Sequence, residues 1–316
     1  MNPKTSVMWL GISCAALLLP AVGSEMPATQ PAQASAKQTT FATPEAAAEA
    51  LIGASARFDT EALKKILGSE GVDLVITDDP VSDKNQSVAF AAEARVNTGI
   101  VHDPKDPKAA TLTVGADAWP MPIPLVEQDG RWRFDSAAGR QEILFRRIGS
   151  NELSAIQMCL GYVEAQHDYA SQKRNGARVN QYAQHFISTP GKQDGLAWRA
   201  PDGTWQGPVG HEIAALVNEG YTDKREPFHG YYFKILKGQG PAAPMGEMNF
   251  VVEGVMIGGY ALVAAPANYG VTGVKTFIVS HTGIVYEKDC GPDSLEQFRA
   301  MERYEPDPSW SPVQEP

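Results

Sequence analysis

The chain has 316 residues, of which 43% are apolar, 20% are charged and only three are cysteine, which excludes an intrinsically disordered protein and a disulfide-built scaffold. Its net charge of −10 repels phosphate backbones, so we expect no nucleic-acid partner. The length is sufficient for about two domains.

Residues 1–24 have the pattern of a secretory signal peptide. Lys4 gives a positive start, an apolar run follows from Val7 to Leu19, and the small residue Ser24 ends a peptidase site. The apolar run is shorter than the roughly 20 residues that a membrane span needs. We therefore predict export to the periplasm or the extracellular space, with no transmembrane span after signal cleavage.

Two alternatives stay open for this segment. Cleavage after Gly23 fits nearly as well. The other alternative is a lipoprotein with a lipid attached to Cys14, although Gly11 stands where lipoproteins have an aliphatic residue. Residues 25–40 are rich in Ala, Gln, Pro, Thr and Ser and show no hydrophobic period. This composition predicts a disordered tether between the signal peptide and the folded part.

Residues 41–149 are predicted to form an N-terminal α+β domain. Thr43 and Pro44 are typical of a helix start, and Asp59 starts a second helix that Gly68 ends. Helices followed by a curled antiparallel sheet are similar in order to cystatin-like or NTF2-like modules. Further elements are predicted as a helix at 84–96, strands at 72–78, 110–116, 122–127 and 131–135, and a hairpin turn at Asp129 and Gly130.

The segment WPMPIPLV at 119–126 has two interpretations. Pro120, Pro122 and Pro124 alternate, which would place them on one face of an extended chain. That face would be a peptide-like binding ridge, or the segment would be an edge strand whose prolines block further pairing.

A second α+β domain is predicted over residues 150–305. A helix at 136–148 is expected to end at Gly149, and a long helix is expected at 151–172, with a single bent helix as the alternative. Turn spacing in the rest predicts an antiparallel meander packed on the long helix. Its elements are predicted as a loop-rich stretch after 175, a short helix at 209–218, strands at 229–237, 249–254, 259–266, 274–280 and 284–288, a helix at 292–303, and a Pro-rich tail at 306–316 that Trp310 pins to the body.

Several sequence runs taken together resemble a known family. They include RRIGSNEL, AQHDYA of the long helix, FHGYYFKIL, YGVTGVKTFIVSHTGIVYEKD and PDPSW. The chain resembles the bacterial exported family of domain of unknown function 2950 over about residues 41–310, a likeness that implies no activity. Residues 150–290 more weakly resemble the globular half of type IV pilins and pseudopilins, which implies a pilin-like fold without pilus assembly, since the residues upstream of the helix are polar.

The sequence contains no known catalytic or cofactor motif. It lacks a nucleophile elbow, a P-loop and a dinucleotide fingerprint, and the zinc-like start HEIAA has Ala215 where a second histidine is needed. We therefore predict no cofactor and no metal. Cys159 and Cys290 form a disulfide or stay unpaired, and Cys290 with His281 as its base is a weaker hypothesis for a nucleophile.

Aromatic side chains concentrate in the second domain. Where aromatic side chains lie beside polar turns, they would stack on sugar rings. The alternative is that these side chains pack the core. Together with carboxylates such as Glu212, Glu219, Glu287 and Asp289, they motivate one alternative function, a cell-envelope glycan or peptide hydrolase. The favoured prediction is an exported, non-enzymatic binding or assembly module with an envelope protein or glycan as partner. The candidate contact aromatics are Trp198, Trp205, Phe228, Tyr231, Tyr232 and Tyr260.

Overall fold

The computed structural model describes residues 38–174, 176–210 and 227–314, which divide into two compact units. The first unit ends at Ile143 and the second begins at Leu144, inside a helix. Each unit has its own hydrophobic core and combines helices with antiparallel strands, which confirms the α+β prediction. The predicted signal peptide lies outside the described residues, as does all of the predicted helix 209–218 beyond residue 210.

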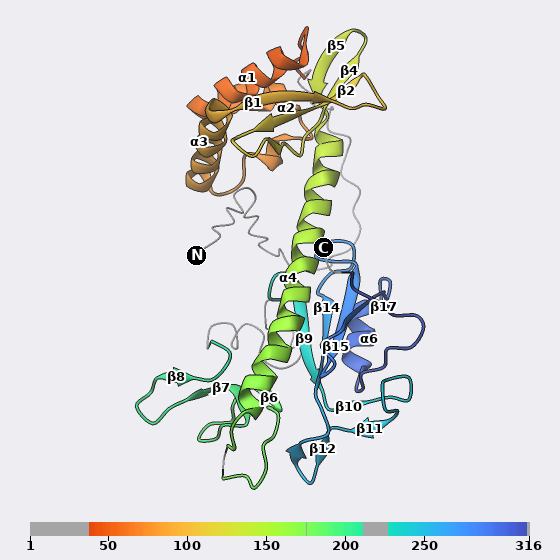
Figure 1. Cartoon of the computed structure of the whole chain (residues 1–316). Helices are drawn as coiled ribbons and strands as arrows, with labels where there is room; N and C mark the ends of the chain where they lie inside the picture. Colours follow the sequence, from red (N-terminus) through yellow and green to blue (C-terminus); the bar gives the residue numbers. More distant parts are fainter. Residues whose placement is uncertain (1–37, 175, 211–226, 315–316) are drawn as a thin grey trace, which may run out of the picture. The chain divides into compact units, whose positions relative to one another are not determined.

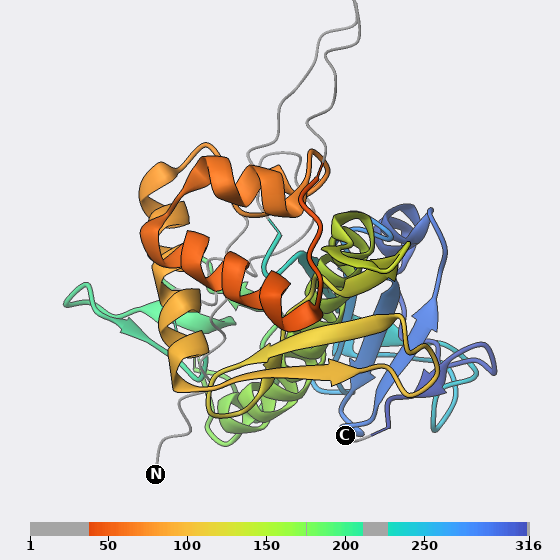
Figure 2. The same ribbon diagram turned by 90° about the horizontal axis from the view of Figure 1, so that it is seen from above.

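In the first unit, three helices gather on one side of an antiparallel sheet (Figure 1, upper part; Figure 2). The strands pair in the order β1-β2-β4-β5, and β3 also pairs with β2. The elements are α1 (Pro44–Arg57), α2 (Thr60–Leu67), η1 (Val72–Leu74), α3 (Pro80–Val96), β1 (Thr98–His102), β2 (Ala109–Val114), β3 (Trp119–Pro120), β4 (Leu125–Gln128) and β5 (Arg131–Phe134). The core between helices and sheet includes Leu51, Leu63, Phe90, Leu112 and Phe134.

The predicted helix starts of this unit are confirmed by their caps. Thr43 Oγ1 accepts a hydrogen bond from the backbone N–H of Ala46 at 3.2 Å, and Asp59 Oδ1 accepts one from Ala62 at 3.0 Å. Each bond satisfies one of the N–H groups that a helix start leaves without a partner.

The strand predicted at 72–78 is wrong. Val72–Leu74 form a turn of 3-10 helix instead, and Arg140 holds it by a 2.6 Å ion pair with Asp73. The buried carboxylate of Asp83 accepts hydrogen bonds from the backbone N–H and the hydroxyl of Thr77, at 2.7 and 2.8 Å. These local contacts fix the segment without any strand partner.

The fold begins earlier than the predicted tether allows. The Gln38 side chain donates hydrogen bonds to the carbonyls of Ile66 and Phe134, at 2.9 and 2.8 Å. Thr39 N–H donates to the carbonyl of Lys65. Residues 38–40 therefore belong to the first unit and not to the tether predicted at 25–40.

The prolines of WPMPIPLV do not form a ridge. Pro120 is exposed, but Pro122 is buried together with Met121 and Ile123. Trp119 and Pro120 pair with the end of β2, and Met121 N–H donates to the carbonyl of Leu112. The hypothesis of a peptide-like ridge is therefore wrong, because the alternating prolines do not share one exposed face: Pro120 is exposed, whereas Pro122 is buried.

Helix α4 (Ser136–Ala170) runs without interruption through the predicted break at Gly149. Glycine within a helix costs about 1 kcal/mol relative to alanine. This cost is too small to end a helix that has buried residues both before and after the glycine, such as Ile143 and Ala155. The hydroxyl of Ser154 donates to the carbonyl of Ser150, one turn back in the helix. The alternative of one helix is confirmed. No helix among the described residues is both long and apolar enough to cross a membrane.

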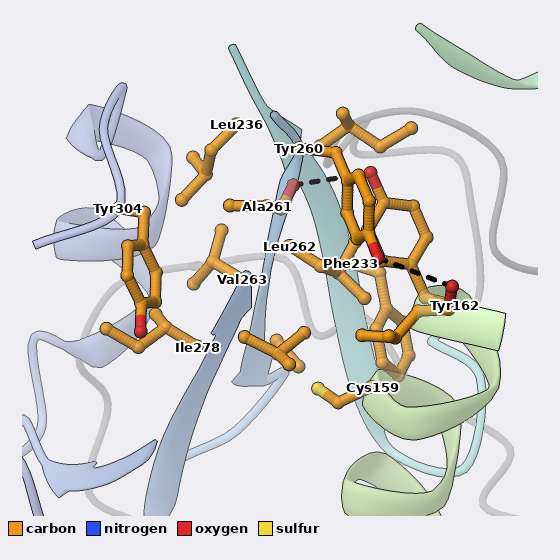
Figure 3. Close-up of a cluster of buried hydrophobic side chains, with 14 of the residues drawn as sticks. Cys159, Tyr162, Phe233, Leu236, Tyr260, Ala261, Leu262, Val263, Ile278 and Tyr304 are labelled. Atoms are coloured by element: carbon orange, nitrogen blue, oxygen red, sulfur yellow. Dashed lines mark hydrogen bonds between the residues drawn. The ribbon is translucent and has the colours of Figure 1, made fainter. Parts of the chain in front are cut away.

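In the second unit, a five-stranded antiparallel sheet has α4 on one face and the short helix α6 on the other (Figure 1, lower part). Figure 3 shows Cys159 and Tyr162 of α4 on one side of the sheet, and Ile278, Val263 and Tyr304 on the other. The strand order is β17-β16-β15-β14-β9. The elements are β9 (Tyr231–Leu236), β14 (Ala261–Pro266), β15 (Lys275–Ser280), β16 (Val285–Asp289), α6 (Ser294–Ala300) and β17 (Ser311–Pro312).

Short strands surround this sheet where a loop-rich stretch or longer strands were predicted. β6 and β7 pair in parallel, and β8 pairs antiparallel with β7. Two small hairpins replace the strand predicted at 249–254. These elements are β6 (His185–Ile187), β7 (Gly195–Arg199), β8 (Trp205–Gln206), β10 (Gly238–Gln239), β11 (Met248–Asn249), β12 (Val251–Val252) and β13 (Val255–Met256).

The Pro-rich tail predicted at 306–316 is part of the sheet as far as the structure describes it. β17 pairs with β16, and Val313 N–H donates to the carbonyl of Val285 at 2.9 Å. Trp310 is buried, as predicted, and Lys288 lies 5.7 Å from the centre of its ring.

Candidate ligand groove

A groove of about 430 Å³ lies beside α4 in the second unit. Three segments that are separate in the sequence form it: the last three turns of α4, the β6–β7 pair, and the residues after β8. Its lining is mostly apolar, with two carboxylates on the helix. The lining residues are Met158, Gly161, Tyr162, Glu164, Ala165, Asp168, Phe186, Leu196, Pro208, Val209 and Gly210.

Helical periodicity explains which α4 residues line the groove. Gly161, Glu164, Ala165 and Asp168 are spaced by three or four residues, so they lie on one face of the helix. The two carboxylates are exposed and one turn apart, whereas Ala165 is buried. Gly161 has no atom within 4 Å of where a Cβ would stand, so the groove has room above it.

Gln166 holds the β6 side of the groove against α4. Its side chain is fully buried and pairs with both backbone groups of Ala183: Nε2 donates to the carbonyl and Oε1 accepts from the N–H, each at 2.8 Å. Nε2 also donates to the Tyr162 hydroxyl at 2.9 Å. The segment leading into β6 therefore lies against the helix as if it were paired with a strand.

Gly207 fixes the position of the residues after β8, which form the third side of the groove. Its φ is +123°, and a Cβ there would stand 2.2 Å from the carbonyl oxygen of Leu196. Only glycine allows this approach, and Val209 N–H then donates to the same carbonyl at 3.2 Å. The chain after β8 is thereby held along β7, where Val209 faces the groove.

The groove carries negative charge that nothing described neutralises. Within the described part of the chain, neither Glu164 nor Asp168 forms an ion pair. Like charges one turn apart destabilise a helix by about 0.2–0.5 kcal/mol. Asp168 also lies in the last turn of α4, where the helix dipole disfavours a negative charge by about 0.3–1 kcal/mol. Burial raises the pKa of the Tyr162 hydroxyl, so the floor stays a neutral phenol.

The predicted contact aromatics do not form a surface. Tyr231, Tyr260 and Trp198 are buried, and the successive residues Tyr231 and Tyr232 point to opposite faces of β9. Trp205 is 38% exposed on β8. None of these residues lines the groove, so the idea of a sugar-stacking platform is not supported and core packing accounts for most of them.

The two cysteines are free and lie on opposite faces of the second sheet. Cys159 lies on the face of α4 that is buried against the sheet, and its burial raises the pKa of the thiol to about 12. Cys290 lies beside the hydroxyl of Thr276, which is on the same face of β15 as Ile278, the face that α6 covers. Of the two alternatives, the structure has the unpaired cysteines, because the sheet stands between the two sulfurs.

The hypothesis of a Cys290 nucleophile is also not supported. Cys290 lies beside Thr276 at the start of β15, whereas His281 follows the end of that strand. Five residues of extended chain separate Thr276 from His281 by roughly 16 Å. Burial lowers the pKa of His281, whose ring packs edge-on against Phe250 and Tyr260.

The carboxylates named in the sequence analysis either interact with another side chain or lie outside the described residues. Glu287 lies 3.7 Å from Lys275 on the neighbouring strand, and Asp289 accepts a hydrogen bond from the Tyr269 hydroxyl. Glu212 and Glu219 lie outside the described residues. Across the described ranges, no three His, Cys, Asp or Glu side chains are grouped as metal ligands.

The sequence interpretation missed Glu164 and Asp168. The available signal was an i, i+4 pair of like charges at the end of a helix, a pattern that costs stability unless something binds it. Without the structure, nothing indicated that an apolar floor would lie beside these two residues.

Comparison with protein-family models matches the chain to the family described as "Protein of unknown function (DUF2950)" over residues 38–313. The chain belongs to the DUF2950 family. The match begins at Gln38, the first described residue of the first unit, and ends at Val313, the residue that bonds to Val285. No curated protein and no solved structure gives a significant match, so the likenesses to cystatin, NTF2 and pilin folds stay predictions.

Two of the runs that resemble the DUF2950 family meet around the start of β15. Asn151 of RRIGSNEL donates to the carbonyl of Thr272 at 2.9 Å, and Glu152 accepts from the backbone N–H groups of Val274 and Lys275 at 2.9 and 3.0 Å. These contacts position α4 on its sheet. The run AQHDYA (165–170) instead supplies Ala165 and Asp168 to the groove and Gln166 to its wall.

Proposed function

We propose that this DUF2950 protein is an exported bacterial envelope protein that acts by binding a partner, and that the groove beside α4 is its binding site. The observation that carries the proposal is the combination of an apolar lining with two carboxylates, Glu164 and Asp168, that form no ion pair with any residue the structure describes. The signal-like residues 1–24 support export.

The groove has the size and lining of a recognition site. Its volume of about 430 Å³ falls in the range of roughly 300–1,000 Å³ that is typical of ligand sites. Apolar side chains supply buried area, and a few polar groups fix the orientation of what binds. An assembly role fits the same geometry, because a partner's side chains would fill the groove.

Filling the groove is the direct test of this function. We expect Gly161→Tyr to abolish retention of envelope components by the purified chain, because the new ring stands over the groove floor. The variant should fold, since no atom lies within 4 Å of the new Cβ and tyrosine favours a helix more than glycine does. Co-purification from cell-envelope extracts, with mass spectrometry of the bound material, is the measurement.

Gly149→Tyr is the matched control. It makes the same change on the same helix, also with no atom within 4 Å of the Cβ, but Gly149 does not line the groove. Retention should be unchanged in this variant. Equal retention by both variants would show that binding, if present, occurs elsewhere.

Export has its own expected result. A reporter fused after residue 30 should accumulate outside the cytoplasm, and replacing Leu18 with aspartate should hold it inside, because the charge interrupts the apolar run. Fractionation and reporter activity in each compartment measure this. Cytoplasmic retention of the unchanged fusion would refute export.

A further inference from the structure

We propose that the groove binds a basic, apolar segment of a partner protein, with a lysine or arginine side chain placed between Glu164 and Asp168. This inference rests on the proposed function and adds the chemistry of what is bound. The juxtaposition of an apolar floor with two carboxylates that have no ion-pair partner among the described residues carries it.

The charge arrangement selects a cation. The two carboxylates lie on the same face of α4, one turn apart, and neither forms an ion pair within the described ranges. A single positive group between them relieves their mutual repulsion and also opposes the negative end of the helix dipole at Asp168. His167 does not serve this purpose, since its ring packs edge-on against Tyr260 at 6.0 Å.

The floor selects an apolar body next to that charge. Met158, Tyr162, Phe186, Leu196 and Val209 line the groove beside the carboxylates. Lysine and arginine carry aliphatic stems that lie along apolar surface while the charged end stays near water. A neighbouring apolar residue of the same segment would fill the remaining volume, to which the flexible Met158 adapts.

The charge of the whole chain argues against a second copy as the partner. At a net charge of −10, copies repel one another, whereas a basic segment is drawn towards the groove from a distance. The same charge disfavours anionic lipid surfaces. A protein segment of opposite charge is therefore the partner that the electrostatics favour.

The test uses two labelled synthetic peptides, one alternating lysine and leucine and the other alternating glutamate and leucine. Fluorescence anisotropy measures their binding to the full chain at low and at physiological salt. We expect the Lys–Leu peptide to bind at least about tenfold more tightly than the Glu–Leu peptide, and the difference to shrink with salt.

Charge-removing variants localise the effect. The double variant Glu164→Gln/Asp168→Asn should weaken Lys–Leu binding about tenfold or more and flatten its salt dependence. The control Glu49→Gln/Asp117→Asn removes two exposed carboxylates from the first unit, the same net charge, and should change binding less than about twofold. Equal loss in both variants would overturn the proposal, because the attraction would then come from the overall charge.

The failures of the two proposals are distinguishable. If envelope material is retained in a Gly161-dependent way but Lys–Leu and Glu–Leu peptides bind equally, the preference for a basic segment is wrong and the groove remains a binding site. If Gly161→Tyr changes neither peptide binding nor retention, the groove is not the binding site and both proposals are wrong.

Discussion

Replacing Gln166 with alanine is expected to destabilise the second unit by about 3–5 kcal/mol. The change leaves the buried backbone N–H and C=O of Ala183 without partners and opens a cavity between α4 and the segment before β6. Each unpaired buried group costs about 1–3 kcal/mol. Because Gln166 is 0% exposed, these two backbone groups have no contact with bulk water in the folded protein.

Urea unfolding of the full chain and hydrogen exchange of peptides covering 182–199 measure this effect. Exchange in that segment should accelerate before the rest of the unit, because its attachment to α4 is lost. Gln157→Ala is the control, since Gln157 is exposed on the same helix, and it should change stability by less than about 0.5 kcal/mol. Unchanged protection in the Gln166 variant would contradict the role assigned to this side chain.

The second large effect is expected for Gly207→Ala, which should cost about 3 kcal/mol or more. The new Cβ would lie 2.2 Å from the Leu196 carbonyl oxygen and 3.0 Å from the Ala197 Cα, both backbone atoms that yield only if the strand moves. The φ of +123° adds strain for any residue with a Cβ. The wall formed by Val209 should separate from β7, so the variant should also lose groove binding.

Gly203→Ala is the control that separates the steric clash of the new Cβ from the strain of a positive φ. Gly203 also has a positive φ, +85°, but the nearest atom to its Cβ position is the Nε of Arg199 at 4.0 Å. We expect a cost of about 1–2 kcal/mol from conformation alone. Thermal unfolding of the two variants side by side should show the larger loss at Gly207. Equal losses would mean that the approach to Leu196 is not what requires glycine there.

Local signals in the sequence predicted most of the fold. The caps at Thr43 and Asp59 and the apolar strands β14 and β15 follow from side-chain chemistry within a few residues. The segment 72–78 shows the limit of this reasoning. It alternates like a strand, but a strand needs a partner, and Asp73 and Thr77 are instead bonded to Arg140 and Asp83.

The groove could not be predicted from local sequence patterns, because it forms only where three segments that are far apart in the sequence meet. Nothing in the sequence pairs Ala183 with Gln166, or brings Val209 to Leu196. Of the two alternatives for the aromatic residues, the sugar-stacking one could have been discounted by a rule that the sequence does contain. Successive residues of a strand face opposite sides, so Tyr231 and Tyr232 never belonged to one surface.

The last strand of the second sheet, β17, lies near the end of the described chain, so the first unit is synthesised in full well before the second sheet is complete. All residues of the first unit are present once residue 143 has been made, but the edge strand β17 of the second sheet is completed only near Val313, whose N–H bonds to Val285. At roughly 5–20 residues per second, the 170 residues between 143 and 313 take about 10–30 s to add. During that interval every residue of the first unit is already available to pair, whereas the β17 edge of the second sheet has yet to be added.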